Sequence, residues 1–368
     1  MQVSEFDYEL PDALIAQQPV PRGASRLLVL HRATGAIDHA NVSDLNRYFR
    51  SGDVLAVNTT RVFAARLLGR RVPSGGAVEC LLLGPAMRSD CSARDPGTAA
   101  APQTGADSVV CCDALVHPGQ KLNIGAVMRF EGTAGVLMAE VLERRFHGRR
   151  TIRLWAESGG DVDQLVDALG HIPLPPYIKR PDTAVDSERY QTIFAAVRGS
   201  VAAPTAGLHF TTEMAAALDR AGVERAEITL HVGYGTFKPV RSATVEDHVV
   251  DPEPYDIPDA AAAAINGARA EGRRVIAVGT TTTRALEDAA ARSGGPVTPG
   301  PGAASLFIYP GFQFQVIDGL MTNFHLPRSS LLMLVCAFAG REPVLAAYEE
   351  AVRHGYRFYS YGDAMLLL

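Results

Sequence analysis

The sequence predicts a layered α/β main domain that carries an inserted small antiparallel β-barrel domain. Three observations lead to this fold class. The chain has 368 residues, which is long for one hydrophobic core and favours two domains. Residues 63–155 hold short alternating strands between Gly and Pro turns, whereas the rest alternates strands with helices. We therefore expect a discontinuous α/β domain of residues 1–62 and 156–368, interrupted by a barrel of residues 63–155.

The first sixty residues mix short strands with one helix. Residues 25–42 have the pattern of a strand, a Thr-Gly turn and a second strand. Residues 44–50 form a short amphipathic helical pattern that ends at Ser-Gly, and residues 53–58 predict a buried strand. Asn58, Thr59 and Arg61 stand at the end of that strand. Because open α/β sheets bind ligands at strand ends, these three residues are substrate-binding candidates.

The inserted domain is recognised by strands with a period of two and no helical period. We expect six of them, at residues 64–72, 77–83, 111–119, 126–132, 135–144 and 149–157. Residues 85–108 are small, polar and rich in Pro and Gly, which predicts a mobile loop between two strands. Arg144, Arg145, Arg149 and Arg150 lie at the end of this domain. They are candidates for binding nucleic-acid phosphates, although charge runs are more often solvated surface.

The second part of the main domain alternates helices with strands. A helix at residues 161–169 precedes a Pro-rich extended loop, and a helix that begins at Thr211 precedes a strand. Residues 259–294 predict a helix, a strand, a tight polar turn and a second helix. The apolar residues 331–340 predict a short buried helix, because about 18 to 20 such residues are needed to span a bilayer.

Composition limits the class and the location of the protein. A hydrophobic content of 47% and a net charge of −5 are ordinary for a soluble globular protein. The N-terminus lacks the apolar segment of a signal peptide, and no stretch predicts a membrane span. The five cysteines are an odd number, which without a secretion signal indicates reduced thiols and a cytoplasmic location. Cysteine and histidine spacings fit no zinc site, so we expect no metal.

Residues 199–211, GSVAAPTAGLHFT, form the first of four polar motifs. Small residues such as Gly207 allow a ligand to approach backbone N–H groups closely. Thr205 and His209 lie just before a helix whose N-cap is Thr211 or Thr212, and helix N-termini favour negative ligand groups. The alternative is an ordinary capped loop.

The second motif is residues 230–240, LHVGYGTFKPV, which predict a strand that ends in a turn. The third glycine of a dinucleotide-binding fingerprint is missing, and no helix follows. Gly235 and Thr236 fit a flexible turn beneath a ligand, and Tyr234 or Phe237 is available to stack on a base.

The third motif places four threonines at a strand-to-helix turn, in RVIAVGTTTTRALE at residues 274–287. Thr280, Thr281 and Thr282 are suited to binding an anion, a carboxylate or a ribose, and Arg284 follows them. The lysine of a P-loop is absent, which disfavours triphosphate hydrolysis. A Thr-rich helix cap is an equally good interpretation.

The fourth motif interrupts the apolar C-terminal region at residues 322–330 with TNFHLPRSS. Asn323, Phe324, His325 and Arg328 bring an amide, a phenyl ring, an imidazole and a guanidinium close together. Buried polar groups cost free energy without partners, so such a cluster indicates a site. The alternative is a loop that caps the next helix through Ser329 or Ser330.

Together these segments resemble the S-adenosylmethionine:tRNA ribosyltransferase-isomerase family of queuosine biosynthesis. The resemblance extends over nearly the whole chain in order, through FDYELPDALIAQQPV, DVLAVNTTRVFAARL, LPPYIKR, DSERYQTIFA, the four polar motifs and YRFYSYGDAM. Family members are expected to have a β-barrel inserted in an α/β domain. Two features depart from the family pattern: Asp251 stands where a second histidine is usual between His248 and Glu253, and the loop at 85–108 is longer.

The resemblance implies that the ribosyl group of S-adenosylmethionine is transferred to 7-aminomethyl-7-deazaguanine at the tRNA wobble position. The group is rearranged to an epoxycyclopentane, which gives epoxyqueuosine-tRNA and releases adenine and methionine. S-adenosylmethionine is then consumed as a substrate, and no cofactor is expected. The expected partner is tRNA, and the protein is expected to be a monomer without membrane contact. The tRNA-binding candidates are Arg144, Arg145, Arg149, Arg150, Lys179 and Arg180.

The implied reaction needs a base for the C5′ proton beside the sulfonium, and help for the departure of adenine. His209 and His325 are candidates for these roles, because a base tuned near neutral pH suits histidine. Glu253 and Asp363 are candidates to orient an imidazole or accept from ribose hydroxyls. The substrate-binding candidates are Asn58, Thr59, Arg61, Thr205, Gly207, Tyr234, Gly235, Thr236, Phe237, Thr280, Thr281, Thr282, Arg284, Asn323, Phe324 and Arg328. A methyltransferase and a non-catalytic RNA-binding module remain as alternatives.

Overall fold

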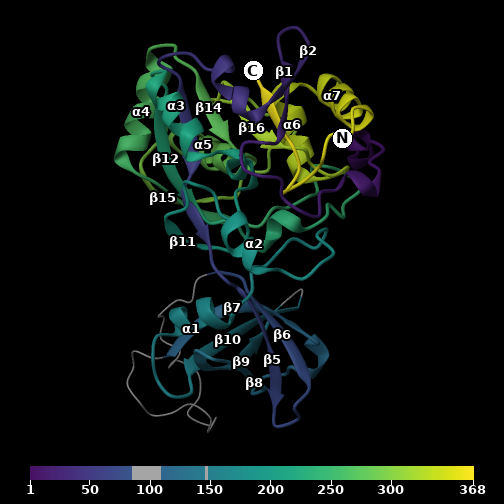
Figure 1. The fold of residues 1–368 in the computed structure, drawn as a ribbon, viewed down its shortest axis with the longest axis vertical. Helices are drawn as coiled ribbons and strands as arrows, with labels where there is room; N and C mark the ends of the chain where they lie inside the picture. The colour runs from purple at the N-terminus through teal and green to yellow at the C-terminus, as the bar shows by residue number, and fades with distance from the viewer. Residues whose placement is uncertain (85–108, 146–147) are drawn as a thin grey trace.

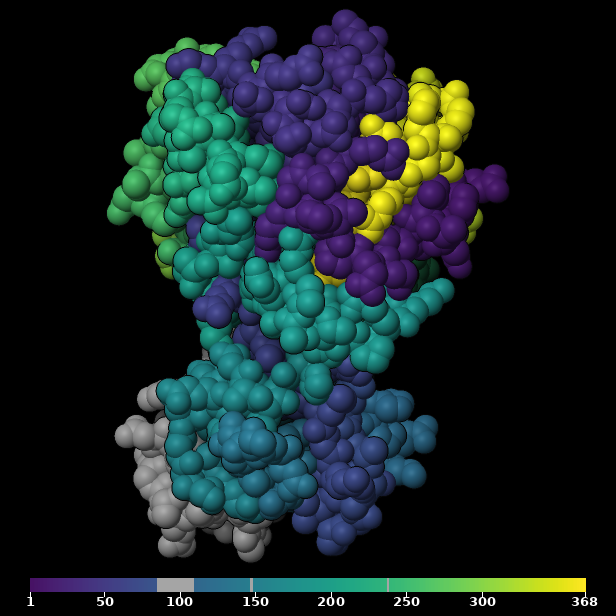
Figure 2. Space-filling model, viewed as in Figure 1, coloured from purple at the N-terminus to yellow at the C-terminus, as the bar shows by residue number. Residues whose placement is uncertain are grey.

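The computed structural model describes residues 1–84, 109–145 and 148–368, without the side chain of Phe237. The predicted mobile loop at 85–108 lies outside these residues. Figure 1 shows a large α/β part joined to a smaller β-barrel through crossing strands. The molecule narrows where the two parts meet, as the space-filling view in Figure 2 shows. The predicted fold class, a layered α/β domain with an antiparallel barrel, is confirmed.

The main domain is built on a nine-stranded mixed sheet with the order β15-β13-β12-β3-β14-β16-β17-β1-β2. Strands β12, β3, β14 and β16 are parallel to one another, whereas β17 is antiparallel to β16 and parallel to β1. The bounds are β1 Arg26–His31, β2 Ala36–Asn41, β3 Val54–Asn58, β12 Glu224–Leu230, β13 Glu253–Ile257, β14 Val275–Val278, β15 Gly300–Ala304, β16 Gly319–Asn323 and β17 Ala364–Leu367.

Both faces of this sheet are covered, as the continuous apolar runs of its strands require. Leu28 and Leu30 of β1 face a core formed with α4 Asp259–Ala270, α5 Thr280–Ser293, α6 Ser330–Ala339 and α7 Arg341–Arg353. Leu27 and Val29 face the opposite core, which includes α3 Thr212–Arg220. The alternation along one strand thus produces the three layers.

Two local predictions for this domain have different outcomes. The helix expected at residues 44–50 is a 3-10 helix at Val42–Tyr48, where Asn41 and Asp44 form a capping box and Phe49 returns to extended backbone. Thr211 is the N-cap of α3, and its side chain accepts a hydrogen bond from the Met214 N–H, as the sequence indicates.

The barrel closes in the order β10-β7-β6-β5-β8-β9. Its strands are β5 Arg66–Val72, β6 Ala77–Leu82, β7 Val109–His117, β8 Val127–Gly132, β9 Gly135–Arg144 and β10 Arg149–Ala156, within a few residues of the six predicted ones. Helix α1 Val162–Leu169 packs on it, with Val162 and Val166 in the barrel core. The apolar core of the barrel therefore extends beyond residue 155, where we expected the main domain to resume.

Short elements complete the two parts and the connections between them. They are β4 Thr60–Val62, β11 Val197–Ser200, α2 Ala184–Arg189 and the 3-10 helices η1 Val3–Phe6, η2 Asp12–Leu14, η5 Gly119–Lys121, η7 Thr205–His209 and η8 Tyr234–Phe237. β4 and β11 pair in parallel beside the connection to the barrel. Among the described residues, no single helix has the length and apolar composition to cross a membrane; only the pair α6 and α7, bent by 116°, meets both criteria together.

The expectation that all thiols are reduced is wrong at Cys111, which is disulfide-bonded. Cys111 lies on the outer side of β7, where a partner can reach it, whereas the next residue, Cys112, faces the barrel core. Cys80, Cys112 and Cys336 are free and buried. Burial raises the pKa of Cys112 and of Cys336 to about 12, which keeps both thiols protonated.

Candidate functional site

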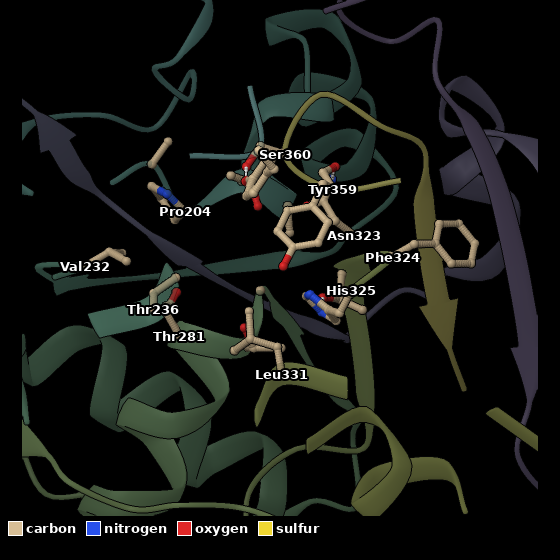
Figure 3. Close-up of a pocket in the computed structure, with 17 residues that line it drawn as sticks. Pro204, Val232, Thr236, Thr281, Asn323, Phe324, His325, Leu331, Tyr359 and Ser360 are labelled. Carbon is tan, nitrogen blue, oxygen red and sulfur yellow. Dashed lines mark hydrogen bonds between the residues drawn. The ribbon is translucent and has the colours of Figure 1, made fainter. Parts of the chain in front are cut away.

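A cavity opens at the carboxyl ends of the parallel strands β14 and β16, where open α/β sheets bind ligands. The space between its walls is about 530 Å³ when the open solvent at its mouth is counted. All four polar motifs of the sequence contribute to its wall, as Figure 3 shows for the labelled residues. The lining is Tyr177, Ala203, Pro204, Thr205, Ala206, Val232, Thr236, Gly279, Thr280, Thr281, Thr322, Asn323, Phe324, His325, Leu331, Tyr359 and Ser360.

This lining contains no charged side chain. Hydroxyls, one amide, one imidazole and two tyrosine rings supply its polarity. A ligand that carries a positive charge therefore meets dipoles and aromatic faces in this cavity rather than a fixed cation. The cavity is suited to a cationic or neutral ligand with several hydrogen-bonding groups.

The β14–α5 turn forms one wall of the cavity. Gly279 has φ 96°, a backbone conformation that L side chains rarely adopt, so glycine is required there. Thr280 and Thr281 line the cavity beside it. The Thr282 hydroxyl instead donates to Val278 O at 2.7 Å, the last carbonyl of β14. The predicted threonine site is therefore formed by two residues, and Thr282 ties α5 to β14.

His325 is the one imidazole among the residues that line the cavity. Its Nε2 lies 2.8 Å from Thr322 Oγ1, and its backbone is held by two tyrosine hydroxyls: Tyr348 accepts from its N–H and Tyr8 donates to its carbonyl. Burial lowers the pKa of His325 to about 3, so the ring is neutral at physiological pH. Figure 3 shows the ring beside Tyr359 and Leu331.

His209 does not line the cavity, although the sequence predicts it as a second catalytic imidazole. Its Nδ1 lies 3.0 Å from Ser25 Oγ and its Nε2 lies 3.0 Å from Nδ2 of Asn323, so both ring nitrogens have partners. Burial lowers the pKa of His209 to about 4, against the opposing effect of the Asp363 carboxylate. His209 therefore stands behind Asn323, one residue away from the cavity.

Glu253, Asp363 and Arg284 stabilise the walls of the site instead of facing the cavity. Glu253 Oε2 accepts from Arg284 at 2.6 Å, and its other oxygen accepts from the Gly233 N–H at 3.0 Å. Asp363 accepts from the Arg26 and Arg357 N–H groups at 2.9 and 2.8 Å. Neither carboxylate makes a hydrogen bond to an imidazole in the described part of the chain, which corrects the orienting role we expected.

The candidates at the end of β3 also have structural partners. The Asn58 side chain bonds to the backbone of Leu230 and Thr60. The Thr59 hydroxyl lies 3.1 Å from Ile228 O, and Arg61 lines a different surface pocket, near α2. None of the three lines the cavity, because the polar end of β3 is used to join β12 and β4.

Three other predicted contacts also differ from expectation. The Phe324 ring lies within 5.2 Å of Tyr348 and 5.0 Å of Phe358 between ring centroids, and Figure 3 shows it pointing away from the cavity. Gly207 is buried, and a Cβ there would meet Thr192 at 2.8 Å, so its small size serves packing. Arg328 is exposed and ion-paired with Asp7.

The turn at η8 connects the cavity with the barrel. Thr236 lines the cavity and also an adjoining pocket that contains His248, Asp251 and Glu253. Gly235 lines that second pocket and a third one, which lies between the barrel and the main domain. Tyr234 lines this crevice as well. The predicted base-stacking role of Phe237 lies outside the described side chains.

The arginines at the end of the barrel are paired or buried. Arg149 Nη2 lies 2.9 Å from Asp251 Oδ2, which also lies 2.6 Å from Lys238 Nζ. Arg145 pairs with Asp113 at 3.1 Å, and Arg144 donates to Asn123 Oδ1. The prediction that Arg150 binds phosphate is wrong. Its side chain is 3% exposed and donates to three backbone carbonyls, so it cannot present a phosphate-binding surface.

The two remaining tRNA-binding candidates belong to the Pro-rich loop. Lys179 is exposed, with its Nζ 3.9 Å from Asp12. Arg180 forms a two-pronged ion pair with the buried Asp186, at 2.7 and 2.8 Å. Asp186 also accepts from Tyr361, and these hydrogen bonds hold the pKa of its carboxyl well below the usual range although burial opposes them. Arg180 thus anchors the loop, while Lys179 remains on the surface.

Several cavity residues were not predicted as site residues. Tyr359 has φ 72°, and such backbone in a non-glycine residue clusters at functional sites. Its carbonyl accepts from Asn323, and its ring lies 3.9 Å from that of Tyr177 between centroids. Ser360 follows it in the lining. The segment YRFYSYGDAM contains both residues, so the resemblance marked the segment but not their positions.

Among the described residues, one group of side chains has metal-ligand geometry, away from the cavity. His39, Glu350 and His354 bring their ligand atoms within 4.8 Å of one another. Glu350 Oε1 lies 3.4 Å from His39 and 2.9 Å from His354, while Arg353 pairs with the same carboxylate. The group is therefore internally paired without an ion, and the expectation that the protein uses no metal stays a prediction.

Comparisons with known proteins show which proteins this chain is similar to. The family model described as queuosine biosynthesis protein matches residues 3–367. Proteins named S-adenosylmethionine:tRNA ribosyltransferase-isomerase from Heliobacterium modesticaldum and Moorella thermoacetica are 48% and 49% identical, with full coverage of both chains. The crystal structure of an S-adenosylmethionine tRNA ribosyltransferase from Thermotoga maritima has 37% identity and a TM-score of 0.52, with 99% of this chain and 100% of that one covered.

Proposed function

The chain belongs to the queuosine biosynthesis protein family, and we infer that it catalyses the reaction for which its relatives are named. It is a transferase and isomerase that acts on S-adenosylmethionine and tRNA. The resemblance stated from the sequence is thus confirmed across the chain. The reaction that it implies moves the ribosyl group of S-adenosylmethionine to the amine of 7-aminomethyl-7-deazaguanine in tRNA, with release of adenine and methionine.

The observation that carries this function is the convergence of four distant motifs on one uncharged cavity. We propose that S-adenosylmethionine binds there and is consumed as a substrate without a further cofactor. Its sulfonium would lie against the Tyr359 and Tyr177 rings, since aromatic faces attract cations. Its carboxylate would meet Thr280 and Thr281 at the N-terminus of α5, where backbone N–H groups favour anions.

His325 is the proposed base for the C5′ proton. It lines the cavity, and within the described residues its ring makes a hydrogen bond through Nε2 and none through Nδ1. A neutral imidazole can accept a proton and does not repel a bound sulfonium. A pKa of about 3 makes His325 a weak base in the empty site. Ligand binding must therefore alter its surroundings, or positioning must supply much of the rate.

The tRNA is proposed to approach from the barrel side. The crevice between the two domains contains Arg145, Arg149 and Tyr234, and pockets that share Gly235 and Thr236 connect it with the cavity. A wobble base that enters along these pockets would bring its amine to the sulfonium nucleoside. The monomeric state and the cytoplasmic location remain predictions of the sequence.

Incubation with S-adenosylmethionine and tRNA that carries the deazaguanine amine tests the function. Mass spectrometry of the nucleosides should show the ribosyl-derived addition, together with free adenine and methionine. A methyltransferase would instead add a methyl mass and release S-adenosylhomocysteine. A binding module would give no turnover, and either of these results would overturn the assignment.

A further inference from the structure

The orientation of the Asn323 amide can be derived from its neighbours. Its Nδ2 lies 3.1 Å from the carbonyl oxygen of Tyr359, which can only accept a hydrogen bond. The NH₂ group, and not the oxygen, must therefore point to Tyr359. The same Nδ2 lies 3.0 Å from Nε2 of His209, so the second N–H is directed at the imidazole. Both amide protons are used by the protein.

This orientation also fixes the tautomer of His209. Nε2 must be unprotonated to accept from Asn323, so the ring proton is on Nδ1 and is donated to Ser25 Oγ at 3.0 Å. His209 is buried, with 4% exposure, and its low pKa preserves this neutral state. His209 thus provides a fixed acceptor that holds the Asn323 side chain in one orientation.

The amide oxygen of Asn323 is left without a partner. Asn323 is 2% exposed, and its Oδ1 is one of four buried side-chain nitrogen or oxygen atoms in the described chain that lack a hydrogen bond. Of these four, only the Asn323 atom belongs to a residue that lines the cavity. Buried acceptors are nearly always satisfied in native proteins, so an unsatisfied one on a residue that lines the cavity is a place where a ligand can supply the missing donor.

We propose that Asn323 Oδ1 accepts a hydrogen bond from an amino group of the bound substrate, and that His209 is the positioning residue for this contact. The inference rests on the proposed function for its substrates. We consider three such groups: the exocyclic amine of adenine and the amine of methionine, both in S-adenosylmethionine, and the primary amine of the tRNA base that reacts with it. The oxygen cannot serve a bare carboxylate or ether, which offers no proton.

The test measures dissociation constants by calorimetry for wild type and Asn323→Leu. Each ligand is compared with an analogue that lacks one amine: S-inosylmethionine, the deaminated methionine analogue, and tRNA whose deazaguanine carries a methyl group, which has no donor, in place of the aminomethyl group. For each pair, the preference is the dissociation constant of the analogue divided by that of the natural ligand. For one of the three pairs, this preference should be about 3- to 10-fold larger in wild type than in Asn323→Leu. The ligand that shows this coupling identifies the amine.

The control is Asn266→Leu. Asn266 lies on α4 and exchanges two hydrogen bonds with the backbone of Val297, at 2.8 and 2.9 Å, away from the cavity. This variant should keep the wild-type preference. A wild-type protein that discriminates less than 2-fold against all three analogues overturns the inference even if Asn323→Leu does not fold. The dissociation constants are measured without turnover. A negative product assay would therefore contradict the proposed function, whereas a missing preference would contradict only the Asn323 contact.

A second experiment tests whether His209 positions the Asn323 side chain. His209→Gln can still offer an acceptor to Asn323, whereas His209→Leu cannot. We expect the glutamine variant to recover most of the ligand preference and the leucine variant to lose it, with melting temperatures measured for both. Equal preference in the two variants would show that His209 is only a packing residue.

Discussion

The cavity of the main domain and the arginine-rich end of the barrel use polar groups in opposite ways. Around the cavity, neutral groups are joined in a short hydrogen-bonded chain from Ser25 through His209 to Asn323, and one acceptor is left for a ligand. At the barrel end, the charges largely neutralise one another, as in the Arg149–Asp251–Lys238 group. A dense set of neutral polar residues therefore indicated the site better than a run of charge did.

The physical reason is the cost of burial. A buried neutral group without a partner is rare and informative, whereas an exposed arginine readily finds a carboxylate at small net gain. Asp251, which stands where the family usually has a second histidine, belongs to the charged kind of site. Its carboxylate links Arg149 of the barrel to Lys238 of the main domain. An uncharged histidine at that position would give these cations a weaker partner. The four experiments below test the comparison, in order of decreasing expected effect.

Loss of the cavity imidazole should have the largest effect. In single-turnover assays, His325→Ala should slow the chemical step by about 10²- to 10⁴-fold, the usual contribution of a general base. His209→Ala should act more weakly, through the position of Asn323. If both variants react at nearly the wild-type rate, the acid–base proposal is wrong and the cavity works by positioning alone.

Removal of the buried carboxylate beside the cavity should cost stability. Glu253→Ala leaves the Arg284 guanidinium buried without its partner at 2.6 Å, which should lower the free energy of unfolding by about 3 to 5 kcal/mol. Urea denaturation measures this change. The exposed pair of Arg129 and Glu131 provides the control, since Glu131→Ala should leave the unfolding midpoint unchanged. If Glu253→Ala and Glu131→Ala lower the free energy of unfolding equally, the buried ion pair stabilises the protein no more than the exposed one.

The buried histidines predict a pH dependence of stability. The pKa of His209 is lowered to about 4 in the folded protein, below the ~6.5 of an unfolded chain, so the unfolded state binds the proton more readily. The stabilisation is present above pH ~6.5 and is lost as the pH falls toward 4. Between pH 7 and pH 5, wild type should lose about 2 kcal/mol relative to His209→Gln. If the free energy of unfolding falls equally with pH in the two proteins, the pKa of His209 is not lowered in the folded state.

Substitutions of Arg149 and Arg150 should have smaller effects than those above, one on tRNA binding and the other on stability. Arg149→Ala should weaken tRNA binding and reduce the slope of log affinity against log salt by about 1, because Asp251 is exchangeable for a phosphate. Arg150→Ala should lower the melting temperature and leave that slope unchanged, since its side chain bonds to the barrel backbone. The same salt slope in both variants would mean that neither arginine contacts phosphate.

Local signals accounted for much of the fold and for part of the site. The period-two strands predicted all six barrel strands, and the N-caps are Thr211 and Ser329, each one of the two residues that the sequence left open. Thr280, Thr281, Asn323 and His325 lie in the cavity as expected. The sequence could not distinguish Thr282, whose hydroxyl bonds to the end of β14, from its neighbours. Tyr359 was missed because its left-handed backbone depends on contacts with residues far along the chain.

The sequence by itself determined the element types, the two-domain pattern and the family, because periodicity, caps and contiguous motifs are local properties. Only the tertiary structure decided which polar residue faces the cavity and which stands behind it. His209 and His325 look alike in sequence, yet one has both nitrogens bonded and the other lines the cavity. Hydrogen-bond partners 114 and 184 positions apart made that difference, and no local pattern encodes such distances.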